Sequence, residues 1–242
     1  MDPRAAGDLA LAPRPLEAAP AERAALARTA LPRRSDRRAG GVPRRGAVSR
    51  AAVFFDRDGT LCREVGYVNH PDRLELMPQA AAVLREVRAA GLAAVVCTNQ
   101  AGVARGYFPL HVVEETRERL FALLAREGAG LDGYYACVHH PELGPPGIRR
   151  RCRCRKPGPG MLEQAARELG IDLSRSFVVG DSFKDVGAGR AAGVAATVML
   201  RTGYGRGEIL WKGAASDVWP DWIADDLAGA WRYIQARLGA GR

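Results

Sequence analysis

Apolar runs long enough for a β-strand recur along the chain, and polar residues follow each of them. They lie at 51–55, 92–97, 132–140, 176–180 and 194–200, and an edge strand is expected at 217–223. Apolar runs without strict alternation are typical of strands buried on both faces of a parallel sheet. The pattern therefore predicts a sheet whose strands lie in the interior of the protein.

Segments with apolar residues at helical spacing separate these runs. They predict helices between Pro78 and Gly91, at 109–127, at 161–169 and at 224–238, and a further helix that contains Asp185. Regular alternation of strands and helices predicts an α/β fold, a three-layer Rossmann-like sandwich with a mostly parallel central sheet. No insertion is long enough for a large cap domain.

Charge is distributed unevenly along the 242 residues, although the net charge is +9. Residues 1–50 carry 11 Arg and five acidic residues, whereas the remainder is nearly balanced. We expect residues 1–48 to be a disordered extension rich in Arg, Ala and Pro, and 49–242 to form a single domain. Paired arginines in the extension leave open a role in binding nucleic acid or an acidic surface, and a start codon placed too far upstream would also explain the segment.

The chain has no apolar run near the roughly 20 residues of a membrane span, and its N-terminus lacks the apolar core of a secretory signal. Five cysteines, an odd number, fit poorly with a disulfide framework. The cytoplasm is the expected compartment.

Candidate chemistry begins with Asp56 and Asp58, which follow the first apolar run in the stretch D-x-D-G-T-L. Ligands bind outside the carboxyl ends of the strands in open α/β sheets, so both carboxylates are expected at the site. One carboxylate can attack phosphorus if a divalent cation neutralises the phosphate, and the other can act as general acid and base. An ordinary Asp-Gly turn is the alternative for the shorter pattern D-x-D-G.

Further polar residues follow the second and fourth strands. Thr98, Asn99 and Gln100 offer a hydroxyl and amides that suit a phosphate, and Asp181 follows the fourth strand. Lys156 precedes a helix N-terminus, where its charge can reach the same site.

Four metal-ligand residues form two close pairs, C-x-H at Cys137 and His139 and C-x-C at Cys152 and Cys154. Their spacing predicts a closed tetrahedral zinc site that staples the loop 137–154. His140 is an alternative to His139 as the imidazole ligand. The alternative without a metal is two free thiols and a surface histidine.

Taken together, these motifs resemble those of the haloacid dehalogenase-like phosphatases, over about residues 50–235 and in the same order. The resemblance implies that Asp56 is the nucleophile that forms an aspartyl-phosphate, that Asp58 is the general acid and base, and that Lys156 stabilises the phosphoenzyme. It also implies a catalytic Mg²⁺ held by Asp56, Asp181 and the backbone carbonyl of Asp58. The zinc loop resembles the branch that contains heptose-bisphosphate and histidinol-phosphate phosphatases.

The expected substrate within this branch is a small phosphorylated sugar, most simply D-glycero-D-manno-heptose 1,7-bisphosphate losing its 7-phosphate. Arg155 is expected to hold the second phosphate, because a planar guanidinium grips phosphate in bidentate fashion. Arg105, Glu64, Gly66 and Tyr67 are further candidates for contacts with the sugar. Alternatives are histidinol phosphate and a nucleic-acid 3′-phosphate or binding role through the Arg-rich extension. A monomer without membrane or nucleic-acid partners is expected.

The residue after Asp181 departs from the sequence pattern of this branch. The better-known heptose enzymes carry Lys directly after the Asp of the fourth motif, where this chain has Ser182, with Lys184 two residues further on.

Overall fold

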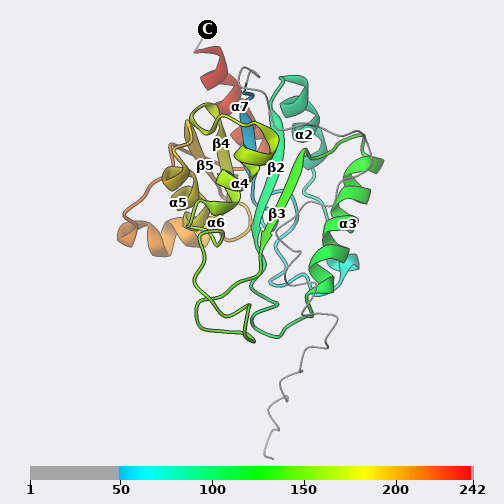
Figure 1. Ribbon diagram of the computed structural model, residues 1–242. Coiled ribbons are helices and arrows are strands. Elements are labelled where there is room, and N and C mark those ends of the chain that lie inside the picture. The colour runs from blue at the N-terminus through cyan, green and yellow to red at the C-terminus, as the bar shows by residue number, and fades with distance from the viewer. Residues whose placement is uncertain (1–48, 241–242) are drawn as a thin grey trace, which may run out of the picture.

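The computed structural model describes residues 49–240, and within this range six strands form one sheet in the order β3-β2-β1-β4-β5-β6 (Figure 1). The strands are β1 (Ala52–Phe55), β2 (Ala93–Asn99), β3 (Gly133–Cys137), β4 (Phe177–Gly180), β5 (Ala196–Leu200) and β6 (Trp222–Ala224). Every neighbouring pair is parallel. The predicted α/β class and parallel sheet are confirmed.

The strand order reverses next to β1. The chain builds β2 and β3 on one side of it and then crosses to build β4, β5 and β6 on the other. Phe55, the last residue of β1, pairs with Val96 of β2 and Val179 of β4. The loops that follow these three strands therefore meet at one edge of the sheet, which is where α/β sheets bind ligands.

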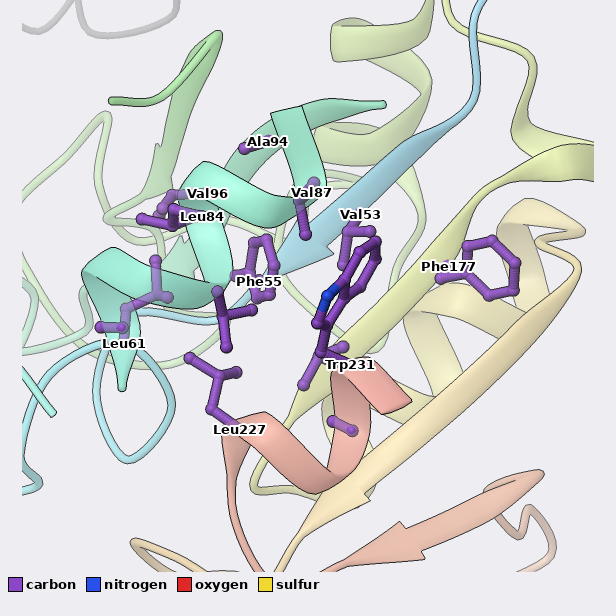
Figure 2. Close-up of a cluster of buried hydrophobic side chains, with 14 of the residues drawn as sticks. Val53, Phe55, Leu61, Leu84, Val87, Ala94, Val96, Phe177, Leu227 and Trp231 are labelled. Carbon is purple, nitrogen blue, oxygen red and sulfur yellow. The ribbon is translucent and has the colours of Figure 1, made fainter. Parts of the chain in front are cut away.

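Helices cover both faces of the sheet and make the three predicted layers. Helices α2 (Ala80–Ala89), α3 (His111–Arg126) and α7 (Leu227–Gly239) pack on one face, and α4 (Gly160–Leu169) and α5 (Phe183–Ala192) pack on the other. Side chains of β1 alternate between the faces, with Val53 and Phe55 in the first layer and Ala52 and Phe54 in the second. Figure 2 shows Val53 and Phe55 beside side chains of α2 and α7.

Shorter elements complete the described chain. They are 3₁₀ turns at Pro71–Arg73, Leu173–Arg175 and Gly213–Ala215, the one-turn helix α6 (Gly205–Gly207) and a π-helical turn at Glu208–Lys212.

Two predicted boundaries near the C-terminus are wrong. The edge strand begins only at Trp222, because Pro220 has no N–H for a ladder and Asp221 is bound through its carboxylate to the backbone N–H of Thr197. The last helix begins at Leu227, since the Asp226 side chain accepts a hydrogen bond from the N–H of Gly229 and caps it.

The loop between β3 and α4, residues 138–159, contains no helix or strand. Val138 and Ile148 of this loop are buried in a small apolar cluster with Val103, Phe108 and the start of α3. The loop thus packs beside the segment that follows the carboxyl end of β2.

Residues 1–48, which we expect to be a disordered extension, lie outside the described residues. Among residues 49–240, no helix combines the length and the apolar character needed to cross a bilayer.

Candidate active site

A cavity of about 200 Å³ opens at the carboxyl ends of β1, β2 and β4. It brings together every predicted site residue apart from the zinc ligands. They are Asp56, Asp58, Glu64, Gly66, Tyr67, Thr98, Asn99, Gln100, Arg105, Arg155, Lys156 and Asp181. Segments separated by more than 120 residues in the sequence thus form one site.

Three carboxylates and one ammonium group lie at the base of the cavity. Oxygens of Asp56, Asp181 and Asp185 lie within 4.8 Å of one another. Lys156 Nζ lies 3.0 Å from Asp56 Oδ1, forms a second ion pair with Asp185, and donates to the backbone carbonyl of Cys97 at 2.7 Å. Burial alone would lower the pKa of Lys156, but the charges of Asp185 and Asp56 raise it above its usual value. The buried side chain therefore stays charged.

Asp181 is the third carboxyl group of this cluster. Burial, together with the charges of Asp56 and Asp185, raises the pKa of Asp181 to about 8. Its Oδ2 accepts a hydrogen bond from the N–H of Tyr204 at 2.8 Å. A divalent cation between Asp56 and Asp181 would remove the repulsion between these carboxylates, and hard carboxylate oxygens are what Mg²⁺ prefers.

Two glycines make room for Asp181. A Cβ on Gly59 would come within 2.0 Å of Asp181 Oδ2, and a Cβ on Gly203 would come within 2.1 Å of the same atom. Both residues also have positive φ, 76° and 52°, which L side chains rarely adopt. Thr202 Oγ1 donates to the Gly59 carbonyl at 2.6 Å and fixes the two loops together. The donor set and the space around Asp181 thus fit a magnesium ion.

Asp185 is the first acidic residue of α5 and holds Lys156 in place. Its Oδ2 accepts from the N–H of Ser182, and the Ser182 hydroxyl caps the first turn of α5 in return. The Ser182 hydroxyl thus caps α5, which a lysine side chain could not do, whereas the hydrogen bond to Asp185 comes from the Ser182 backbone. Lys184 lies at the lining of the cavity instead.

Asn99 ties the end of β2 to the loop that carries Lys156. Its side-chain amide donates to the Lys156 carbonyl at 3.0 Å and accepts from the Lys156 N–H at 3.1 Å. Thr98, at 1% exposed, and Gln100 stand on either side of it, and Gln100 Nε2 donates to Thr98 Oγ1 at 3.0 Å.

Arg57 is a site residue that the sequence reasoning missed. Its side chain is fully buried and binds Asp58 through two hydrogen bonds, Nε to Oδ1 at 2.9 Å and Nη2 to Oδ2 at 2.7 Å. Gln100 Nε2 also donates to Asp58 Oδ2, at 3.0 Å. The available signal was a lone charged residue between two aspartates directly after a buried strand.

The wall of the cavity mixes aromatic, acidic and basic side chains. The rings of Tyr67 and Tyr107 meet edge to face at 4.6 Å. Burial raises the pKa of Glu64, which hydrogen-bonds to the N–H of Gly66 and to Tyr204, a second residue that sequence reasoning did not select. The available signal was the sequence Arg201-Thr202-Gly203 directly before Tyr204.

Arg105 and Arg155 form the basic part of the wall. Both line the cavity, and their charges, together with desolvation, lower the pKa of the His140 imidazole below its usual value. Arg155 Nη1 donates to the His139 carbonyl at 3.2 Å, which fixes it to the zinc loop.

The four predicted zinc ligands come together beside this wall. Cys137, His139, Cys152 and Cys154 each place a ligand atom within 4.8 Å of the others, and their sulfurs stand 3.0 to 3.6 Å apart. All five cysteines are free thiols. Hydrogen bonds with Cys137 and with its other neighbours lower the pKa of the Cys154 thiol to about 4. His140 is outside the cluster and accepts hydrogen bonds from its own loop. The donor set fits a tetrahedral zinc ion.

Comparisons with known proteins agree with this geometry. A family model described as HAD-hydrolase-like matches residues 153–230. D-glycero-beta-D-manno-heptose-1,7-bisphosphate 7-phosphatase of Yersinia pestis is 39% identical over 77% of this chain and 96% of that protein. The protein of the same name from Escherichia coli strain K12 is 43% identical over 65% of this chain and 82% of that protein.

Solved structures give the same result. D,D-heptose 1,7-bisphosphate phosphatase from B. bronchiseptica, complexed with magnesium and phosphate, has a TM-score of 0.66 and 29% identity, over 77% of this chain and 99% of that chain. A putative HAD-like phosphatase from Mesorhizobium loti has a TM-score of 0.67 and 32% identity, over 80% and 88% of the two chains.

The site has paired aspartates after β1 of a parallel sheet, with the Lys156–Asp185 pair beside them. It is the site of a haloacid dehalogenase-like phosphatase, a class that uses Mg²⁺. Within that class the chain belongs to the D-glycero-beta-D-manno-heptose-1,7-bisphosphate 7-phosphatase family.

Proposed function

We propose that this protein is a magnesium-dependent phosphomonoesterase that removes the 7-phosphate of D-glycero-D-manno-heptose 1,7-bisphosphate through an aspartyl-phosphate. The observation that carries the chemistry is the position of Asp56. Its carboxylate lies at the base of the cavity, 3.0 Å from the ammonium group of Lys156 and beside the carboxylate of Asp181.

The reaction has two steps. An oxygen of Asp56 bonds to phosphorus while the bond from phosphorus to the sugar oxygen breaks, and Asp58 gives its proton to that oxygen. Water then attacks phosphorus, its proton returns to Asp58, and the bond between phosphorus and Asp56 breaks. Lys156 offsets the charge on the phosphoryl oxygens in both steps, and Thr98 is in place to donate its hydroxyl to them.

Asp56, Asp181 and the backbone carbonyl of Asp58 are the proposed ligands of Mg²⁺. When bound, the ion neutralises phosphate and carboxylate charge so that one anion can approach another. Zinc is proposed on Cys137, His139, Cys152 and Cys154, where it fixes the loop that carries Arg155.

The substrate proposal rests on the basic wall. Lys156 and the magnesium ion serve the transferring phosphate, which leaves Arg155 and Arg105 for a second phosphate further out in the cavity. Glu64 and Tyr67 are in place to accept and donate hydrogen bonds to sugar hydroxyls. Holding the remote phosphate orients the reacting one, so its loss lowers the rate as well as the affinity. The names of the relatives agree with this substrate.

Arg155→Ala tests this assignment, with Arg153→Ala as the matched control. Arg153 is two residues away, exposed, and paired with Glu163 rather than with the cavity. Arg155→Ala should lower kcat/KM for the heptose bisphosphate by ~100-fold, as expected for lost positioning of a bound group, and for a sugar monophosphate by less than ~3-fold. Arg153→Ala should change neither.

The same assay distinguishes the heptose bisphosphate from the rival substrate, histidinol phosphate. Histidinol phosphate has a cationic amine and no second phosphate, so Arg155 would hinder rather than help its binding. The substrate proposal is wrong if the wild-type enzyme prefers histidinol phosphate, or if Arg155→Ala slows mono- and bisphosphates equally. A monomer is expected to suffice, because one chain supplies all of these residues, and size measurement in solution checks it.

A further inference from the structure

The buried side chain of Arg57 has an acceptor for each of its N–H donors. Nε and Nη2 bind the two oxygens of Asp58, and Nη2 also donates to Gln100 Oε1 at 3.1 Å. Nη1 donates to the hydroxyls of Thr116 at 3.3 Å and Tyr134 at 3.4 Å. A guanidinium has five donors, and all five are used here. Since burying a charge is costly unless it is fully paired, the orientation of Arg57 is closely determined.

The Nη1 end of Arg57 binds residues of two other elements of the fold, α3 and β3. Thr116 lies on α3 and Tyr134 on β3. The Thr116 hydroxyl gives its own hydrogen to a carbonyl of the preceding turn, so it can only accept from Arg57. Arg57 therefore links Asp58 to α3 and β3, so the positions of these elements help to fix the position of the Asp58 carboxylate.

The two oxygens of Asp58 are bound unequally. Within residues 49–240, Oδ2 accepts from Arg57 Nη2 and Gln100 Nε2, whereas Oδ1 accepts only from Arg57 Nε. A carboxylate oxygen has room for about two donors, so Oδ2 is filled and Oδ1 keeps a free lone pair. The Asp58 side chain is 19% exposed and lines the cavity.

We propose that Arg57 is a positioning residue for the general acid: with Gln100, it fixes the plane of the Asp58 carboxylate and leaves Oδ1 to carry the transferred proton. This inference rests on the proposed function. In the first step the proton on Oδ1 passes to the leaving oxygen as the bond between phosphorus and that oxygen breaks. In the second step a proton from water returns to Oδ1. Gln100 also donates to Thr98, so the same contacts align the acid with the proposed phosphate ligand.

Single-turnover kinetics with enzyme in excess test the proposal, because they report phosphoenzyme formation. The substrates are a sugar phosphate, whose leaving oxygen needs a proton, and p-nitrophenyl phosphate, whose leaving oxygen does not. Asp58→Asn should slow the sugar phosphate by ~10²-fold or more and the aryl phosphate far less. Arg57→Lys keeps the charge but loses the fork. It should slow the sugar phosphate by ~10- to 100-fold and the aryl phosphate by less than ~3-fold.

Coupling between the two residues gives a second readout. Because Arg57 acts through Asp58, adding Arg57→Lys to Asp58→Asn should cause no further loss on the sugar phosphate. Gln100→Met, which removes one donor from Asp58, should show the same selective loss to a smaller degree. Thr197→Val is the control: this buried hydroxyl on β5 binds Asp221, so its loss should lower Tm without changing the ratio of the two substrates.

Equal losses of Arg57→Lys on both substrates, or multiplied losses in the double variant, would overturn the proposal. If Arg57→Lys does not fold, Gln100→Met decides by the same criteria. If Asp58→Asn slows the sugar phosphate selectively but Arg57→Lys slows both substrates equally, only the role of Arg57 is refuted. If Asp58→Asn slows both substrates equally, Asp58 is not the general acid, and the inference about Arg57 fails with it.

Discussion

Asn99 binds the backbone of Lys156 rather than its charged side chain. The amide of Asn99 and the peptide groups of Lys156 exchange two hydrogen bonds, at 3.0 and 3.1 Å, across 57 residues of sequence. The Lys156 side chain is thereby free to bind Asp56 and Asp185. The side-chain amide of the last residue of β2 thus helps to fix the position of the Lys156 ammonium group beside Asp56.

Replacing Asn99 by Asp should damage catalysis more than folding. The new carboxylate oxygen would face the Lys156 carbonyl, so the loop that carries Lys156 should shift. We expect kcat to fall by ~10- to 100-fold, in line with the cost of misplacing a catalytic group by ~1 Å. Asn69→Ala is the control, because Asn69 binds only Arg73 on the surface and should leave kcat unchanged. Unaltered kcat in Asn99→Asp would contradict the assignment.

Asp56→Asn should abolish turnover and the phosphoenzyme while the protein stays folded. An amide is a poor nucleophile, but it is nearly isosteric with the carboxylate it replaces. Acid-quenched protein from the wild type should carry phosphate that hydroxylamine releases, and Asp56→Asn should carry none. Circular dichroism checks the fold. Hydroxylamine-sensitive phosphate on Asp56→Asn would show that another residue is the nucleophile.

Stability without metal should fall as the pH rises. The Asp181 pKa is about 8 in the folded protein against 3.8 for the free group, so the folded state holds an extra proton between these values. Stability changes with pH in proportion to the protons bound by the unfolded state minus those bound by the folded state, which is negative here. In EDTA, Tm should therefore decline between about pH 4 and 8, with the Asp185 contribution confined to pH values below about 6.

Two comparisons isolate the group responsible. Asp181→Asn should flatten the decline in Tm, because the amide does not titrate. Added Mg²⁺ should raise Tm of the wild type most at high pH, where the carboxylates are free of protons. If the Tm of the wild type and of Asp181→Asn declined in parallel with pH in EDTA, Asp181 would not be the cause of the decline.

Zinc should copurify with the protein and remain after EDTA has removed magnesium. We expect about one zinc per chain in protein purified without chelator, as a closed site with four protein ligands predicts. Cys154→Ser should lose the zinc and lower Tm. Cys97→Ala, a change of a buried thiol outside the cluster, should keep the zinc. Wild-type protein without zinc would refute the site.

Three of the predicted site residues could be placed from the strand pattern. Asp56 and Asp181 directly follow buried strands, Thr98 lies near the carboxyl end of another, and the parallel sheet brings these strand ends to one edge. The zinc pairs could be predicted for a related reason, since two closely spaced pairs of ligands leave few geometries open. The boundaries of β6 and α7 could not, because they depend on single hydrogen bonds of Asp221 and Asp226.

The sequence by itself determined the α/β class, the order of the motifs and the four residues of the Cys/His cluster, because these depend on local periodicity and short spacing. Only the tertiary structure decided what each side chain contacts within the site. Arg57 lies between the two aspartates in sequence, but its acceptors include Gln100, Thr116 and Tyr134, and chain distances of 43 to 77 residues separate them from it. Asn99 likewise looked like a phosphate ligand, and its partner proved to be the backbone of Lys156. Buried polar groups bind whatever donor or acceptor the packed fold places within about 3 Å, and no local pattern carries that information.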